Sequence, residues 1–272
     1  MTDAMLPVPV LSVLVVAHNE EAQLAACLDA LSFADELVVV LDKCTDGTKA
    51  IAESYGAHLL EGAWEIEGHR RNAGRDACRG AWILEVDADE RASAALGKEI
   101  KAAIDGVRDG YFLLPFDNYI GDRLVRHGWG GSWGVSAAPR LSAKGAKRWG
   151  EQRIHPSLTL AGPRRWLKTP IRHNVDKNIS DMLQRLDRYT TARAADLRAG
   201  GDIGGLGSNI RRMFSRFAKC YLSRKGYREG AYGFLIALMA GLYPVLSHLK
   251  ARLERDGKRD DEPDRERDVE RE

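Results

Sequence analysis

The sequence predicts an α/β protein in which a mostly parallel sheet is flanked by helices and followed by a C-terminal helical appendage. Apolar, β-branched runs alternate with amphipathic segments through residue 90, which is the pattern of repeated strand and helix units. A long uncharged segment then stands near the C-terminus, at residues 231–246. The chain has 272 residues, of which 44% are hydrophobic, so it can bury a large core and still carry an appendage.

Four strands are expected in the first third of the chain, at residues 10–17, 37–41, 57–60 and 81–86. Helices are expected between them, because leucines recur at helical spacing after the first strand. Polar residues end three of the strands: His18, Asn19 and Glu20 the first, Asp42 the second, and Asp87 and Asp89 the fourth. Since ligands bind at the carboxyl ends of parallel strands, we expect these side chains to meet in one site.

The second half of the chain has a different pattern. A helix is expected up to residue 106 and a strand at 111–115, followed by a stretch rich in Trp, Gly and Arg. The glycines at 200–207 follow no predicted strand, so we interpret them as a hinge and not as a phosphate-binding loop. The predicted organisation is a sheet domain at 1–199, a hinge and helical segment at 200–250, and a charged, disordered tail at 251–272.

Composition excludes some classes of protein. The formal net charge is only +2, which does not indicate a nucleic-acid-binding surface. Four scattered cysteines without a CxxC pair are typical of free thiols in a reducing compartment, although a disulfide or zinc role is the alternative. The N-terminus has an acid and prolines where an export signal has a basic cluster and an unbroken apolar run, so we expect a cytoplasmic protein.

The acids after the fourth strand are the sharpest local signal for chemistry. Asp87 and Asp89 lie two residues apart in ILEVDADER, and hard cations such as Mg²⁺ or Mn²⁺ prefer carboxylate ligands. Such a pair can hold a cation together with a diphosphate. The alternative is a pair of solvated acids at a strand end.

Three segments carry a resemblance to a known family: SVLVVAHNEEAQLAACLDAL, ADELVVVLDKCTDGTKAIAESYGA and GHRRNAGRDACRGAWILEVDADER. In these, and more loosely in RHGW and around His155 and His173, the chain resembles the family 2 glycosyltransferases of the GT-A fold. Within the family it looks most like bacterial lipopolysaccharide core glycosyltransferases. The resemblance implies a metal-dependent, inverting hexosyltransferase that uses a nucleotide-sugar donor and a glycolipid or other lipid-linked saccharide acceptor.

The resemblance also implies roles for single residues. Matching positions for donor binding are Asn19, Glu20, Asp42, Arg71, Asn72 and Asp87, and those for the metal are Asp87, Asp89 and His173. Structural roles are the alternatives: a helix cap for Asn19, a turn for Asp42, a surface ion pair for Arg71 and a hydrogen-bonded framework role for His173.

Two departures from the family pattern concern donor choice and the catalytic base. The stretch from Asp42 to Gly47 is one residue short, and His155-Pro156 stands where relatives have His-Glu. An inverting transfer needs a base, for which Glu151 and His155 are the candidates, with Asp117 as a further acid. Arg140 and Arg153 are candidates for phosphate contacts.

The uncharged segment at 231–246 is flanked by basic residues on both sides. It is short of the ~20 apolar residues that span a bilayer. We expect in-plane or shallow insertion, and therefore a peripheral protein at the inner face of the plasma membrane. The alternative is a buried helix packed on the catalytic domain or on a second copy.

Two rival functions stay open on the sequence alone. A sugar nucleotidyltransferase would also pair a metal-binding acid with a nucleotide fold, but its glycine- and lysine-bearing loop is absent near the N-terminus. A non-catalytic homologue that binds nucleotide or glycolipid is the other rival. The donor sugar, nucleotide base, acceptor, metal and oligomeric state are not specified by the sequence.

Overall fold

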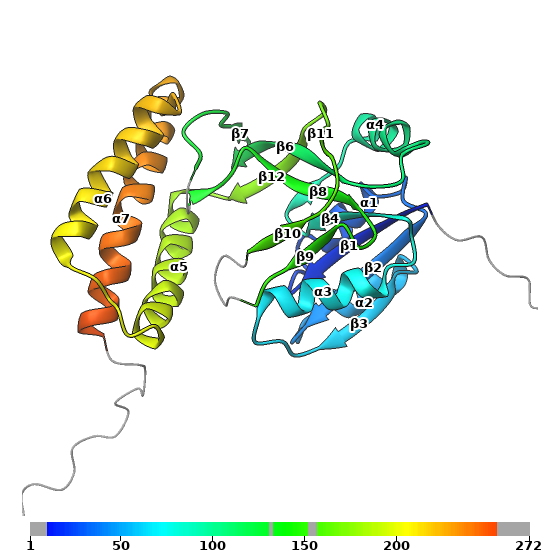
Figure 1. Cartoon of the computed structure of the whole chain (residues 1–272), viewed down its shortest axis with the longest axis horizontal. Coiled ribbons are helices and arrows are strands. Elements are labelled where there is room, and N and C mark those ends of the chain that lie inside the picture. Colours follow the sequence, from blue (N-terminus) through cyan, green and yellow to red (C-terminus); the bar gives the residue numbers. More distant parts are fainter. Residues whose placement is uncertain (1–9, 131–132, 152–156, 255–272) are drawn as a thin grey trace, which may run out of the picture.

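The computed structural model describes residues 10–130, 133–151 and 157–254. The predicted α/β class is confirmed: a sheet lies between helices, and a separate layer of three long helices follows it (Figure 1).

The first half of the sheet consists of parallel strands in the order β3-β2-β1-β4. These are β1 (Leu11–Ala17), β2 (Glu36–Asp42), β3 (His58–Gly62) and β4 (Trp82–Asp87), within two residues of the predicted ranges. The helices between them are α1 (Leu24–Asp29), α2 (Thr48–Ser54) and α3 (Glu67–Ala77). This half matches the sequence prediction closely.

Beyond β4 the sheet also contains antiparallel pairs, whose positions the prediction of a mostly parallel sheet did not specify. Its order continues β4-β8-β6-β12-β5, with β8 antiparallel to both neighbours and β12 parallel to β6. The elements are β5 (Glu90–Arg91), α4 (Ala94–Ile104), β6 (Tyr111–Ile120), β7 (Arg123–Leu124), β8 (Ala137–Ala143), β11 (Arg164–Trp166) and β12 (Ile171–Asp176). A hairpin of β9 (Lys147–Trp149) and β10 (Leu158–Leu160) stands apart.

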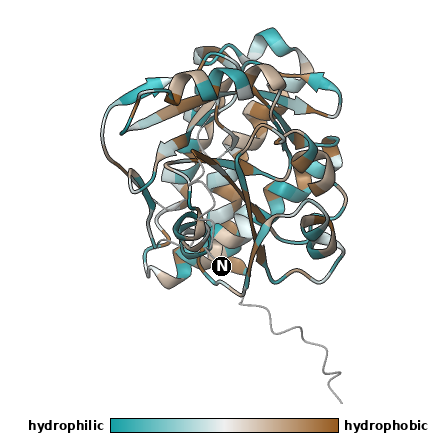
Figure 2. Cartoon of the chain, turned by 90° about the vertical axis from the view of Figure 1, so that its right-hand side faces the viewer, coloured by the Kyte–Doolittle hydropathy of each residue, from teal (hydrophilic) through white to brown (hydrophobic). Residues whose placement is uncertain are grey.

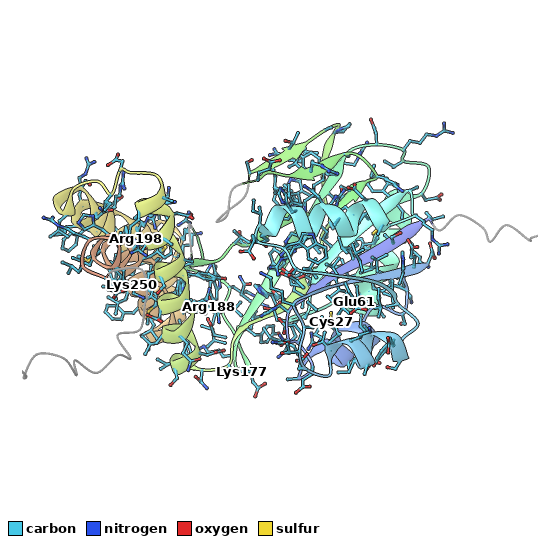
Figure 3. The ribbon with its side chains drawn as sticks, turned by 90° about the horizontal axis from the view of Figure 1, so that it is seen from below. Cys27, Glu61, Lys177, Arg188, Arg198 and Lys250 are labelled. Atoms are coloured by element: carbon cyan, nitrogen blue, oxygen red, sulfur yellow. The ribbon has the colours of Figure 1, made fainter. Side chains whose placement is uncertain are left out.

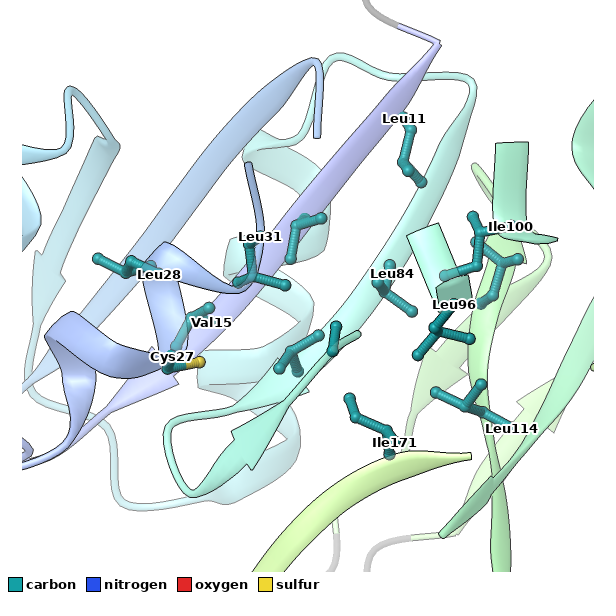
Figure 4. Close-up of a cluster of buried hydrophobic side chains, with 14 of the residues drawn as sticks. Leu11, Val15, Cys27, Leu28, Leu31, Leu84, Leu96, Ile100, Leu114 and Ile171 are labelled. Carbon is teal, nitrogen blue, oxygen red and sulfur yellow. The ribbon is translucent and has the colours of Figure 1, made fainter. Parts of the chain in front are cut away.

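The central strands are apolar throughout because both of their faces are buried. On one face Leu11, Val15 and Leu84 pack with residues of α1 and α4 (Figure 4). On the other face Leu14 and Val40 pack with residues near α3. Figure 2 shows the most hydrophobic residues gathered on these strands. The sheet is therefore a rigid base for the loops at its carboxyl edge.

The helical layer consists of α5 (Ile179–Ala199), α6 (Leu206–Ala218) and α7 (Ala231–Leu253), with short turns at Lys219–Ser223 and Gly226–Glu229. Met182 and Leu186 of α5 share a buried cluster with α7. Lys250 of α7, which is labelled in Figure 3, also donates to Asp187 and Thr191 of α5. The layer thus begins before the glycines at 200–207, of which those at 200–205 form the link from α5 to α6 and Gly207 lies in α6.

α7 contains the uncharged segment for which membrane insertion is expected. Among the described residues it is the one helix that is long and apolar enough to cross a membrane, yet 56% of its apolar window is buried inside the protein. Ile236, Met239 and Tyr243 lie in the cluster with α5. This burial agrees with the alternative reading, in which the segment is a packed helix.

Gly74 sets the distance between α3 and the sheet. A Cβ atom there would lie 2.5 Å from a methyl of Leu14 and 2.6 Å from one of Val40. We predict that Gly74→Ala lowers the free energy of unfolding by about 1–3 kcal/mol, because the two elements must separate. Urea denaturation followed by circular dichroism measures the change.

Gly207 of α6 provides the matched control, since nothing lies within 4 Å of a Cβ atom there. Gly207→Ala should leave stability unchanged or raise it by about 0.4–1 kcal/mol. Equal losses in the two variants would contradict this account of α3 packing.

Candidate active site

The polar ends of β1, β2 and β4 meet at one edge of the sheet, as predicted. β1 lies between β2 and β4, with Ala17 opposite Leu41 and Val16 opposite Asp87. The loops are joined by side chains: Asn19 Oδ1 accepts from the Thr45 backbone N–H at 2.7 Å. Asn19 has a positive φ of 56°, a conformation that asparagine tolerates better than most residues. Its observed role is to tie the first loop to the second.

Asp42 is held rigidly at the end of β2. Its Oδ1 accepts from the Trp64 backbone N–H at 3.0 Å, and its Oδ2 accepts from Arg70 Nη1 at 2.9 Å. His18 Nδ1 donates to the Asp42 carbonyl oxygen at 2.6 Å. The Asp42 carboxylate is therefore a nearly buried acceptor held in one orientation at the edge of the sheet.

Glu20 follows Asn19 in the same loop, and its backbone N–H donates to Thr48 Oγ1 at 2.7 Å. Burial raises the pKa of its carboxyl group, and the charges of Asp89 and Asp87 add to that shift against a hydrogen bond from Gln23. The first loop thus places a third acid close to the two acids after β4.

Glu85 forms a buried ionic network behind the edge. Its carboxylate accepts from Arg75 Nη1 at 2.6 Å and from Lys147 Nζ at 2.7 Å, and the Glu85 and Lys147 side chains are each only 1% exposed. Burial alone would raise the pKa of Glu85, but Lys147 and Arg75 outweigh it and lower the pKa to about 2. The network joins β4 to α3 and β9, and so fixes the direction in which β4 ends.

Asp87 is neutralised by two arginines. Its Oδ1 accepts from Arg71 Nη2 at 3.1 Å, and its Oδ2 accepts from Arg140. Burial opposes ionisation, yet Arg140 and Arg71 hold the pKa of Asp87 far below its usual range. Glu90 Oε2 accepts from the Asp87 backbone N–H at 3.0 Å, and Glu90 Oε1 also accepts from Arg140. The Asp87 carboxylate is thus stabilised by both arginines, and each of its oxygens already accepts a hydrogen bond.

Asp89, Glu90 and His173 form a group whose potential ligand atoms all lie within 4.8 Å of one another. Asp89 Oδ2 is 3.4 Å from His173 Nε2, whereas Asp89 Oδ1 is buried with no hydrogen-bond partner in the part of the chain that the structure describes. A buried carboxylate oxygen without a donor is costly. This oxygen fits a position that a cation satisfies.

His173 is oriented by Asn118 of β6, whose Oδ1 lies 2.9 Å from His173 Nδ1. Because an amide oxygen only accepts, Nδ1 donates to Asn118, and Nε2 is the ring nitrogen that faces Asp89. Burial lowers the pKa of His173, but Asp89 and Glu90 outweigh it and raise the pKa. The surroundings of Nε2 therefore favour a positive charge.

The expected metal set was Asp87, Asp89 and His173, and the observed group contains Glu90 in the place of Asp87. Carboxylate oxygens with an imidazole nitrogen suit a divalent cation, so the residues present fit the implied metal. Asp87 as a direct ligand stays a prediction, since its oxygens already accept from arginines.

Other predicted residues have defined structural contacts. Asn72 donates to the Trp149 carbonyl at 2.9 Å and accepts from the Trp149 N–H at 3.0 Å, so both ends of its amide are used. Arg71 donates to Glu67 and lies over the Trp149 ring at 4.9 Å. A donor contact by Arg71 or Asn72 stays a prediction.

The structure separates the candidate bases. The Glu151 side chain is 86% exposed and lies 3.9 Å from His69 Nε2. Asp117 precedes Asn118 on β6, and successive side chains of a strand point to opposite faces, so Asp117 points away from the face on which Asn118 holds His173. His155 and Arg153 lie outside the described residues.

Sequence reasoning missed several contributors to this site. Arg140 was expected to contact phosphate, but it neutralises Asp87 and Glu90. Glu90 and Asn118 were not considered as site residues. A signal for Glu90 was present, because it directly follows Asp89 at the end of an apolar strand.

Comparison with known proteins decides the family. Residues 12–159, more than half of the chain, match the family model described as Glycosyl transferase family 2. This chain belongs to glycosyl transferase family 2. The resemblance found in the sequence is confirmed, and the edge formed by β1, β2 and β4 lies within the matched residues.

Individual relatives of this glycosyltransferase agree with the family. It is 25% identical over 264 residues to the lipopolysaccharide core biosynthesis glycosyltransferase LpsC of Rhizobium meliloti (strain 1021), covering 90% of this chain and 93% of the relative. An uncharacterized glycosyltransferase of Rickettsia felis is 34% identical over 92 residues, which is 34% of this chain and 32% of the relative. Among solved structures, S. aureus TarS 1-349 with UDP-GlcNAc has 16% identity and a TM-score of 0.48, covering 87% of this chain and 81% of TarS.

The buried network around Glu85 generates a stability prediction. Glu85→Gln leaves Arg75 and Lys147 without their shared counter-charge. We expect a loss of about 3–5 kcal/mol in the free energy of unfolding, as for other buried ion pairs that lose one partner. Urea denaturation at pH 7 measures it.

The surface pair of Arg148 and Asp76 is the control, with side chains 59% and 62% exposed. Asp76→Asn should cost less than about 1 kcal/mol, because water replaces the lost partner. A Glu85→Gln protein as stable as Asp76→Asn would show that the network does not fix β4.

Proposed function

We propose that this family 2 glycosyltransferase moves a hexose from a nucleotide-sugar donor to a lipid-linked saccharide such as lipopolysaccharide core, with inversion. The observation that carries the proposal is Asp89, at the edge of the sheet where Asp42 and Asp87 lie. Its Oδ1 is buried with no hydrogen-bond partner among the described residues, and its Oδ2 lies beside His173. The relative LpsC, named for lipopolysaccharide core biosynthesis and aligned over nearly its whole length, supports the choice of acceptor.

We assign the metal site to Asp89, Glu90 and His173, with Mg²⁺ or Mn²⁺ as the cation. The chemistry that such a cation supplies is neutralisation of the charge on the departing diphosphate. The residues themselves supply preorganisation, because Asn118 holds the imidazole and Arg140 holds Glu90 before any ligand arrives. The same edge therefore needs little rearrangement to receive a diphosphate.

Donor recognition is assigned to the residues fixed around the cation site. Asp42 can accept hydrogen bonds from a base or ribose, since Arg70 and the Trp64 N–H hold its carboxylate in one orientation. Asp87 remains ionised and can accept from a ribose hydroxyl through its unused lone pairs. Glu20 and Asn19 shape the loop between them.

The acceptor hydroxyl must lose a proton during an inverting displacement. Glu151 is our candidate base, because its exposed carboxylate follows Trp149, the residue that stacks with Arg71 beside Asp87. His155 is the second candidate. The acceptor is expected at the inner face of the plasma membrane, with the enzyme cytoplasmic and peripheral.

Removal of the Asp89 carboxylate tests the proposal. With Asp89→Asn we expect donor turnover to fall by roughly a hundredfold or more, because an amide cannot bind the cation or offset diphosphate charge as a carboxylate does. Nucleoside diphosphate release is followed with Mn²⁺ or Mg²⁺, a panel of nucleotide sugars and a membrane glycolipid. Folding is checked by circular dichroism.

Asp76→Asn, in the exposed surface pair with Arg148, is the matched control and should retain activity. Full activity of Asp89→Asn would refute the metal assignment. Release of pyrophosphate from a nucleoside triphosphate would favour a nucleotidyltransferase, and ligand binding without turnover would favour a non-catalytic homologue.

Asn118 allows the metal site to be tested without removing a ligand. Asn118→Ala frees the His173 ring, and we expect Mn²⁺ affinity to fall by about 10–100-fold, the usual effect of losing such a support. Tyr119→Phe, on the other face of β6 under Arg172, should bind Mn²⁺ as the wild type does. Isothermal titration measures both, and an Asn118→Ala protein that binds Mn²⁺ as tightly as the wild type would contradict the role of Asn118 as a support of the metal site.

A further inference from the structure

α6 presents an apolar row to solvent. Leu206, Ile210 and Phe214 recur every four residues, so they share one side of the helix, and all three are exposed, Phe214 to 64%. Met213 and Phe217 follow Ile210 and Phe214 by three residues, so they lie on the same side of α6, where they contact Gly241 of α7. The exposed row therefore runs along the edge of the contact with α7. Figure 1 shows α6 on the outer side of the helical layer, with α5 and α7 between it and the sheet.

The apolar surface continues past the end of α6. Leu222 is 61% exposed, and Tyr227 and Phe234 are also exposed. Phe234 makes ring contacts with Phe217 at 5.7 Å and Tyr221 at 6.2 Å. These aromatic contacts connect the row on α6 to the first turn of α7. We call the exposed side chains of Leu206, Ile210, Phe214, Leu222, Tyr227 and Phe234 the α6 surface.

The charge around the α6 surface is almost entirely positive. Residues 206–230 contain seven basic side chains and a single acid, Glu229. Glu229 is engaged elsewhere, because its Oε1 accepts from the backbone N–H groups of Arg126 and His127 at 3.0 Å. Arg211 and Lys219, close in sequence to the apolar row, are exposed. The partner of this surface should therefore be both apolar and anionic.

α5 lacks this combination. It also exposes apolar side chains, Ile179 and Leu183, but three acids, Asp181, Asp187 and Asp196, are interspersed with its arginines. An apolar contact alone would not distinguish the two helices. Of these two helices, only α6 combines its exposed apolar side chains with basic residues and no acid, so α6 is the helix that suits a partner both apolar and anionic.

We propose that α6 lies in the plane of an anionic membrane surface, with the α6 surface inserted at the boundary between headgroups and acyl chains. This deepens the proposed function, on which it rests for the lipid-linked acceptor, by naming the part of the chain that meets the lipid. Aromatic and aliphatic side chains gain from shallow burial there. The arginine and lysine stems extend along the apolar region while their charges reach phosphate groups.

The assignment moves the membrane contact from α7 to α6. The apolar residues of α7 pack against α5 and α6. Gly241 allows α6 to approach closely, since a Cβ atom there would lie 3.0 Å from the Met213 carbonyl oxygen. α7 thus supports α6 from behind. Its long uncharged sequence reflects protein packing.

Vesicle binding tests the apolar half of the proposal. Full-length protein is sedimented with phosphatidylcholine vesicles that either lack or contain phosphatidylglycerol. We expect binding only to the anionic vesicles, and Ile210→Ser with Phe214→Ser should weaken it by roughly tenfold or more, because two inserted side chains are lost. Ile179→Ser with Leu183→Ser on α5 is the matched control and should bind as the wild type does.

A second pair of variants tests the charge. Arg211→Gln with Lys219→Gln should weaken binding to anionic vesicles by about ten- to thirtyfold, given the usual attraction per basic residue. Added salt should reduce wild-type binding, since it screens exposed charges. Lys98→Gln with Arg164→Gln, two exposed basic residues of the sheet domain, should have no effect.

Two outcomes overturn the proposal. In the first, the α6 variants bind vesicles as the wild type does. In the second, the wild type is a dimer that does not bind vesicles, and the Ile210→Ser, Phe214→Ser protein is a monomer. Nucleoside diphosphate release without vesicles separates this result from the catalytic proposal. Lipid binding lost with wild-type turnover retained supports the α6 surface. If the wild type releases no more nucleoside diphosphate than Asp89→Asn does, but its lipid binding depends on the α6 surface, the proposed function is refuted and the membrane proposal stands.

Discussion

The balance of charge at the carboxyl end of β4 is the constraint on which the site depends. The charge of Glu85 is compensated by the buried side chains of Arg75 and Lys147, and that of Asp87 by two arginines. Asp89 has one oxygen near His173 and another without a donor among the described residues. Since a buried carboxylate oxygen without a donor is unfavourable, this Oδ1 is the observation behind the cation that we propose for the site. The other charges hold the strand that presents it.

The mixed half of the sheet completes this arrangement. β12 pairs with β6 in parallel and with β5 in antiparallel register, so His173 lies opposite Asn118 on one side and Glu90 on the other. The acids that follow β4 and a histidine some eighty residues later are thereby brought together. The parallel half ends in the acids, and the mixed half contributes His173, which we propose as the nitrogen ligand, and its support Asn118.

The sequence predicted the parallel strands and the edge at which Asp42 and Asp87 meet, because long apolar runs with polar ends specify strands buried on both faces. It did not reveal Glu90 as part of the cation group, since β5 is two residues long and has no periodic pattern. Nor could the sequence show which of the two helices, α6 or α7, exposes its apolar side chains to solvent. The uncharged run of α7 is the stronger hydropathy signal, but only tertiary packing shows that α5 and α6 cover it and leave Phe214 exposed.

The central claim is that a divalent cation binds between Asp89 and His173 together with the donor diphosphate. The most direct test is a crystal structure of the protein with Mn²⁺ and a nucleoside diphosphate, with anomalous scattering recorded for manganese. We predict an anomalous peak within bonding distance of an Asp89 carboxylate oxygen and of His173 Nε2, and next to a phosphate oxygen. A bound nucleotide with manganese elsewhere, or with no peak between these side chains, would contradict the account.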